Sequence, residues 1–205
     1  MSSAKTVKEL RDISGAGMMD CKKALDECDY DINKAMDILR KNGIAKAQKK
    51  AGRAAKDGII IPYIHPGSKL GVLVEINCET DFVARTDAFQ EFSRNIAMHI
   101  AATAPIAIKK ADVSNELILK EKEIYRDQAL QSGKPENIIE KMIEGRLNKF
   151  YQENVLLEQS FVKDSDKVIQ DLLNDIISTL GENIEIKRFS RFQLGELFKS
   201  EKSSE

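Results

Sequence analysis

The first 43 residues carry apolar side chains at the three- and four-residue spacing of helix faces. Gly15 ends the first stripe, Asp29 or Asp31 can cap the start of the third, and Gly43 is expected to stop it. The apolar positions are Val7, Leu10, Ile13, Ala24, Leu25, Ile32, Ala35, Met36 and Leu39. Residues 1–43 are therefore predicted to form a compact module of three short helices.

The next segment, residues 44–57, is rich in alanine and lysine and poor in large apolar side chains. Its cations are Lys46, Lys49, Lys50, Arg53 and Lys56. Such a segment forms a solvated linker helix, or it offers a basic handle to RNA or to an acidic protein surface. Aromatic and base-reading side chains are absent from it, which favours the linker helix. Nucleic acid is therefore not expected as a partner.

The period changes from helical to strand-like at Gly58. Residues 58–65 and 70–78 are β-branched runs separated by the turn sequence at 66–69, which predicts an antiparallel hairpin. Thr86 can then cap a further helix. Its apolar face consists of Phe89, Phe92, Ile96, His99, Ile100 and Thr103.

Two long, charged helical segments with thin apolar stripes predict a projecting helical hairpin over residues 114–151, joined at 132–134. The joint has a glycine stop and a proline that begins the second helix. An amphipathic helix over 166–180 and an alternating strand over 183–193 follow. Residues 196–205 are polar and are expected to form a flexible tail.

Together these patterns predict an α+β protein in which the helical N-terminal module precedes a core module over residues 58–195. In the core module, helices pack on an antiparallel sheet. The chain has 205 residues and is 42% hydrophobic, which suits one domain or two small ones. Residues 1–57 have a net charge of +4 and the rest −5, so the overall charge of −1 argues against nucleic-acid binding through bulk charge.

Cysteine and histidine are sparse. Three cysteines without a CxxC spacing and two histidines far apart indicate neither a disulfide scaffold nor a metal site. The N-terminus lacks an apolar signal core, and no apolar run approaches the roughly 20 residues that span a bilayer. We expect a cytoplasmic protein that needs no membrane, metal or cofactor.

No catalytic motif is visible. The chain contains no Walker loop, no HExxH, no GxSxG and no complete GxGxxG, so direct nucleotide binding is not expected. His99 and Cys78 could be a nucleophile pair, but a histidine on an apolar helix face is more often a satisfied core residue. Glu79 and Asp81 should alternate faces at a strand end. These residues do not constitute an enzyme active site.

One connector has an unusual composition. It leaves the second strand of the hairpin and enters a helix, and it carries apolar side chains in an expected turn. Its central residues are Thr80, Asp81, Phe82, Val83 and Ala84. The simpler interpretation is a helix-entry staple with the phenylalanine folded onto the core. The other is a presented hot spot, an aromatic side chain beside a charge on a rigid scaffold.

Met18 and Met19 begin the second predicted helix. Adjacent residues of a helix cannot both face a three-helix core, so at least one methionine should be exposed. An exposed methionine suits a partner surface because its side chain adapts its shape. Simple fraying of the helix start would also expose it.

The chain resembles a known family in two long motifs that stand in the family's order. Residues 10–58, LRDISGAGMMDCKKALDECDYDINKAMDILRKNGIAKAQKKAGRAAKDG, are similar to the N-terminal module of the bacterial elongation factor Ts family. Residues 72–86, VLVEINCETDFVART, resemble its second signature. Similar stretches at 96–105, 131–150 and 153–164 extend the resemblance over nearly the whole chain.

The resemblance implies a guanine-nucleotide exchange factor for the translational GTPase elongation factor Tu, acting in translation elongation. It implies a ubiquitin-associated-like N-terminal module in which Leu10, Met18 and Met19 contact the nucleotide-binding domain of the GTPase. It also implies that Asp81 and Phe82 are an intruding pair. In the family, the phenylalanine enters near the magnesium site and disturbs the ion and the phosphate-binding loop.

The length of the chain leaves room for one copy of the core module, whereas longer family members carry two. Similar short members act as homodimers, so the resemblance implies a homodimer here. The hairpin at 114–150 resembles the coiled-coil protrusion of the family. The alternative is a ubiquitin-associated-like module that binds a protein or RNA without exchange activity.

Overall fold

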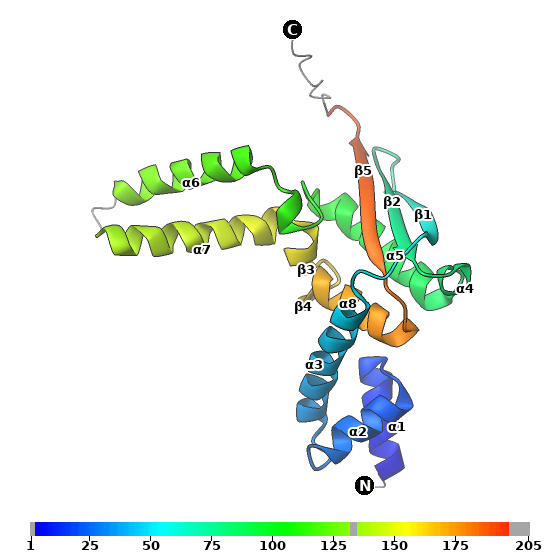
Figure 1. Cartoon of the computed structure of the whole chain (residues 1–205). Helices are drawn as coiled ribbons and strands as arrows, with labels where there is room; N and C mark the ends of the chain where they lie inside the picture. The colour runs from blue at the N-terminus through cyan, green and yellow to red at the C-terminus, as the bar shows by residue number, and fades with distance from the viewer. Residues whose placement is uncertain (1–2, 132–134, 197–205) are drawn as a thin grey trace.

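The computed structural model describes residues 3–131 and 135–196, and it confirms the α+β fold with an antiparallel sheet (Figure 1). The joint expected at 132–134 and the tail beyond Glu196 lie outside the described residues. Within the described ranges, no helix combines the length and the apolar character needed to cross a membrane.

The N-terminal module consists of α1 (Ser3–Ser14), α2 (Met18–Asp26) and the first half of α3 (Ile32–Lys50). The predicted apolar stripes meet in a small core of their own. Its buried members are Val7, Leu10, Cys21, Ala24, Leu25 and Ala35. Of the two candidate caps, Asp31 begins α3, because its carboxylate accepts a hydrogen bond from the backbone N–H of Lys34 at 3.1 Å.

The prediction that the third helix ends at Gly43 is wrong. Helix α3 runs through Gly43 to Lys50, and the separate linker helix over 44–57 is its second half. Gly43 is buried against α8 (Ile169–Leu180), where an added Cβ would lie 3.9 Å from the Cβ of Ser178. Gly43 therefore lies inside the helix, at its contact with α8, rather than at a helix end, and residues 51–56 are not helical.

The sheet has the strand order β1 (Asp57–Ile64), β2 (Leu70–Cys78) and β5 (Glu185–Gln193), with antiparallel neighbours. The predicted hairpin and C-terminal strand are thereby confirmed. The main core is formed by one face of this sheet together with buried residues of α5 (Asp87–Thr103) and α8. Gly58 has φ +140, and a Cβ on it would lie 2.2 Å from the carbonyl oxygen of Ile76.

Helices α6 (Asn115–Leu130) and α7 (Glu136–Asn154) project from the core as a hairpin (Figure 1). Their shared core is small, with Ala129, Ile139 and Ile143 buried. The chain then forms β3 (Ser160–Phe161) and β4 (Asp164–Val168). The helix predicted from residue 166 begins only at Ile169, because 164–168 pair with β3 instead.

Three short elements complete the description. The 3-10 turns η1 (Lys110–Asp112) and η2 (Leu156–Glu158) flank the base of the helical hairpin. The third element, α4 (Asp81–Ala84), lies between β2 and α5 and contains the unusual connector. The fold therefore carries that connector at one end of the central strand of the sheet.

Candidate partner-binding site

The connector between β2 and α5 presents its phenylalanine to solvent. Thr80 caps α4 and accepts a hydrogen bond from the N–H of Val83 at 3.4 Å. The short helix turns Ala84 into the main core and packs Val83 against it, whereas Phe82 is 78% exposed. The interpretation in which the phenylalanine folds onto the core is therefore wrong, because the ring is exposed to solvent.

Asp81 lies beside Phe82 at the start of α4. Its carboxylate forms an ion pair with Arg85 one helical turn later, at 2.8 Å. The Arg85 side chain is largely exposed and that of Asp81 about half-exposed, so this pair contributes little to stability. The site thus combines an exposed ring with a carboxylate whose local partner is replaceable.

A buried thiol donates a hydrogen bond to the connector. Cys78, at the end of β2, has no exposed surface, and its Sγ donates a hydrogen bond to the carbonyl of Thr80 at 3.1 Å. Burial, with the nearby charge of Glu182 adding to it, raises the pKa of this thiol to about 11. The thiol therefore stays protonated at neutral pH and acts as a structural donor.

His99 is a satisfied core residue, as the sequence favoured. The backbone N–H of Val162 donates to its Nδ1 at 3.4 Å, so Nε2 carries the proton and donates to the side-chain oxygen Oε1 of Gln159 at 3.0 Å. Burial lowers the pKa of His99, although the hydrogen bond to Gln159 opposes that shift. Both ring nitrogens are thus engaged in packing α5 against the base of the hairpin.

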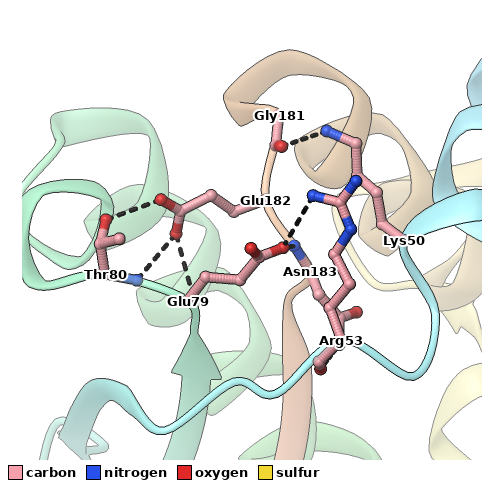
Figure 2. A network of polar contacts seen from close by, with 7 residues as sticks. All are labelled: Lys50, Arg53, Glu79, Thr80, Gly181, Glu182 and Asn183. Atoms are coloured by element: carbon pink, nitrogen blue, oxygen red, sulfur yellow. Dashed lines mark hydrogen bonds and ion pairs between the residues drawn. The ribbon is translucent and has the colours of Figure 1, made fainter.

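The turn between α8 and β5 lies against the connector (Figure 2). The carboxylate of Glu182 accepts hydrogen bonds from the backbone N–H groups of Glu79 and Thr80, both at 3.0 Å, and from the Thr80 hydroxyl at 2.6 Å. Sequence reasoning missed Glu182, because about a hundred residues separate it from the connector and no motif spacing joins the two.

The second predicted surface lies on the N-terminal module. Met18 is 45% exposed and Met19 64% exposed at the start of α2, so both methionines reach solvent. The helix cap there, Gly17, makes no side-chain hydrogen bond. Leu10 differs from the expectation of a contact residue, because it is fully buried under these helices and has no surface to offer in this structure.

The basic segment after Gly43 makes intramolecular contacts. Lys46 pairs with Asp20 at 2.7 Å, Arg53 pairs with Glu79 at 3.6 Å, and the Lys50 ammonium donates to the carbonyl of Gly181. These contacts attach the segment to the α2 start and to the core. They support the linker interpretation, in which the cations act inside the chain.

An exposed aromatic side chain on a rigid sheet-to-helix connector, together with exposed methionines on a separate helical module, is the geometry of a protein-binding factor. Among the described residues, no group of three or more histidine, cysteine or acidic side chains is placed to hold a metal ion.

Comparison with known proteins places the chain in a family. The family model for elongation factor Ts matches residues 3–196. The elongation factor Ts of Thermosipho melanesiensis is 59% identical over 196 residues, which are 96% of this chain and 100% of that protein. That of Geobacter sulfurreducens is 60% identical over 194 residues, covering 95% and 90%. The chain belongs to the elongation factor Ts family.

Proposed function

We propose that this protein promotes the release of GDP from the GTPase elongation factor Tu and thereby supports translation elongation. Membership of the elongation factor Ts family supports this role. The observation that carries the mechanism is Phe82, a large aromatic side chain that is 78% exposed beside Asp81 on a short, capped helix. Aromatic side chains presented on a rigid scaffold are the residues that most often carry the binding energy of a protein interface.

In the proposed mechanism, Asp81 and Phe82 enter the GTPase near its magnesium site. Nucleotide is held there by the ion and by backbone donors around the phosphates. A protein that binds best to the state lacking those contacts speeds nucleotide release without any bond chemistry. Val83 and the buried Ala84 anchor the helix that carries the intruding pair. No catalytic residue is required of this chain.

The N-terminal module supplies the docking surface in this proposal. Met18 and Met19 contact the nucleotide-binding domain of the GTPase, and Leu10 supports them from the module core. The alternative, a docking module without exchange activity, uses this same surface but gives Phe82 no role. A measurement that senses the nucleotide on the partner therefore separates the two.

The test is a binding measurement in four states of elongation factor Tu: nucleotide-free or GDP-loaded, each with and without magnesium. Coupling between two ligands is reciprocal, so a factor that weakens GDP binding must itself bind more weakly when GDP is present. We expect GDP with magnesium to dissociate the complex and chelation of magnesium to tighten it. These differences should shrink for Phe82→Ala.

A matched control is Leu119→Ala, which truncates another exposed apolar side chain, on the projecting hairpin. Its affinity should differ among the four states of the GTPase as much as that of the unmodified protein does. Equal affinity in all four states would exclude exchange at equilibrium, because a ligand that binds two states equally shifts neither. That outcome would leave the docking role alone.

We also propose that the protein is a homodimer through the outer face of its sheet. The face opposite α5 carries exposed apolar side chains on each of the three strands, with Ile64, Leu73 and Phe192 among them. A two-fold axis would place this patch against its own copy. The single core module and the resemblance to short, dimeric family members support a second copy as the occupant.

Light scattering tests the dimer. The mass should be about twice 23.0 kDa at micromolar concentration. Leu73→Lys should yield monomers, because it places a charge in the centre of the patch, whereas Leu119→Lys on the hairpin should leave the mass unchanged. A monomeric unmodified protein with full exchange activity would contradict the proposal.

A further inference from the structure

The Glu182 carboxylate accepts three hydrogen bonds from the connector, and no other acidic residue near the connector does so among the described residues. One carboxylate oxygen accepts the backbone N–H groups of two consecutive residues, Glu79 and Thr80, at 3.0 Å each. The other oxygen accepts the Thr80 hydroxyl at 2.6 Å. Figure 2 shows the Glu182 side chain reaching across from its turn to the strand end. The carboxylate thereby fixes the chain where it leaves β2.

The contact with the Thr80 hydroxyl also sets the direction of a second hydrogen bond. A hydroxyl has one proton to donate, and here it is given to Glu182. The oxygen is then free to accept the N–H of Val83, which is the cap of α4. The orientation of α4, and with it the position of Phe82, depends on both bonds because its helix is only four residues long.

The turn that carries Glu182 is itself held by contacts on its other sides. The Glu79 carboxylate accepts the backbone N–H of Asn183 at 2.7 Å, so the two loops exchange contacts in both directions. The Asn183 side chain donates to the Arg53 carbonyl at 2.8 Å, and Lys50 donates to the carbonyl of Gly181 (Figure 2). The carboxylate is therefore presented from a turn that is fixed to the core and to the end of α3.

We propose that Glu182 is a positioning residue for the exchange site, one that holds Thr80 and α4 so that Phe82 projects ready for insertion. This inference rests on the proposed function. A side chain held in its bound orientation loses less conformational entropy when it binds. Bonds to an ionised carboxylate are about twice as strong as neutral ones, so a single residue can supply this order.

The first measurement is amide hydrogen exchange on the isolated full-length protein, which needs no partner. In Glu182→Ala, protection of the Glu79 and Thr80 amides should fall about tenfold or more, because each loses a charge-assisted bond. Amides of the sheet centre, such as that of Val74, should be unchanged. The matched control is Glu185→Ala, which removes a nearby glutamate that pairs with Lys109, at 3.1 Å, and with Lys187, at 3.7 Å.

The second measurement is the release of fluorescent GDP from elongation factor Tu, with the concentration of loaded GTPase varied. A positioning role predicts that kcat falls about ten- to hundredfold in Glu182→Ala while KM changes less than about threefold. General damage to the fold would instead lower the active fraction and the melting temperature. Glu185→Ala should match the unmodified protein in kcat and KM.

Glu182→Gln keeps the test decisive if the alanine variant unfolds. Glutamine has the same length and retains one oxygen, which can accept from the backbone amides, but it presents an NH₂ group to the Thr80 hydroxyl. Its kcat and its amide protection should both lie between those of the unmodified protein and the alanine variant. Such an intermediate kcat and protection would depend on the number of hydrogen bonds retained, because glutamine and glutamate have side chains of the same size.

Two outcomes would overturn the inference. Unchanged protection of the Glu79 and Thr80 amides in both variants would show that the carboxylate does not hold them. Lost protection with an unchanged kcat would show that holding them does not matter for exchange. Full exchange activity of Phe82→Ala is a different result: it contradicts the proposed function, whereas the protection data would still report the contact itself.

Discussion

Two exposed apolar surfaces of this molecule, at the connector and at the start of α2, are held in different ways. Phe82 lies on α4, whose cap Thr80 is bonded to Val83 and to Glu182 from a distant turn. Met19 lies at the start of α2, whose cap makes no side-chain hydrogen bond, on a module with a small core of its own. One surface is fixed by its surroundings, and the other has fewer constraints.

Under the proposed function, the difference suits two tasks. A side chain that must enter a crowded ion site gains from being held in advance, because ordering it on binding would cost free energy. A docking surface gains from methionines, whose unbranched side chains adapt to the partner. The comparison therefore separates insertion, at the connector, from affinity, at the N-terminal module, and variants of each surface should affect different kinetic constants.

The largest effect is expected for Phe82→Ala. Removing an exposed ring should leave the melting temperature nearly unchanged, whereas truncating a core phenylalanine costs about 3–5 kcal/mol. The kcat for GDP release should fall about a hundredfold or more, in the range of other interactions made only in the transition state. The measurement is fluorescent-GDP release beside calorimetric melting. A destabilised variant with full exchange per folded molecule would remove the distinction between the two surfaces.

A smaller effect, on a different constant, is expected when Met18 and Met19 are both changed to alanine. Each substitution removes apolar surface that would be buried on docking. KM should therefore rise about tenfold with kcat nearly unchanged. A tenfold rise corresponds to a loss of about 1.4 kcal/mol of binding free energy. Stability should change little because both side chains reach solvent. A fall in kcat with constant KM would mean that the methionines also act in insertion.

The fold could be predicted from sequence wherever local patterns and tertiary packing agree. Alternation predicted the sheet, and the caps Asp31 and Thr86 were found by residue type and place. The error at Gly43 arose because glycine serves two purposes. It ends many helices, but here it lies inside α3, buried at the contact with α8.

The site was predictable only in part for the same reason. Apolar character marked Phe82 as unusual, but whether it faced the core or solvent depended on which way a four-residue helix turned. Glu182 could not be found, because its role comes from a contact between two turns far apart in sequence. Helical spacing placed Leu10 on an apolar stripe, and the structure confirms that it is buried; its role as a contact residue came only from the family resemblance.

The smallest expected effect is a difference in the pH dependence of stability between the main core and the N-terminal module. The core contains His99, whose pKa is lowered by burial, whereas residues 1–57 contain no histidine. Above the ordinary value of 6.5, both folded and unfolded states are neutral at His99 and its packing is fully retained. Below 6.5, the unfolded state takes up a proton first, so stability falls by at most about 1.4 kcal/mol per pH unit until the lowered pKa is reached. The protection of α5 amides, measured as the observed exchange rate relative to the intrinsic rate at each pH, should therefore fall between pH 7 and mild acid, while the protection of α1 and α2 amides shows no matching change. In His99→Gln, the protection of the α5 amides should depend less on pH.

Asp175, whose pKa burial raises, contributes to the pH dependence of stability with the opposite sign; because it does so in both proteins, it cancels when the two are compared. Equal slopes for the two proteins would contradict the role of His99, and equal responses of α1 and α5 would mean that the two regions unfold as one unit.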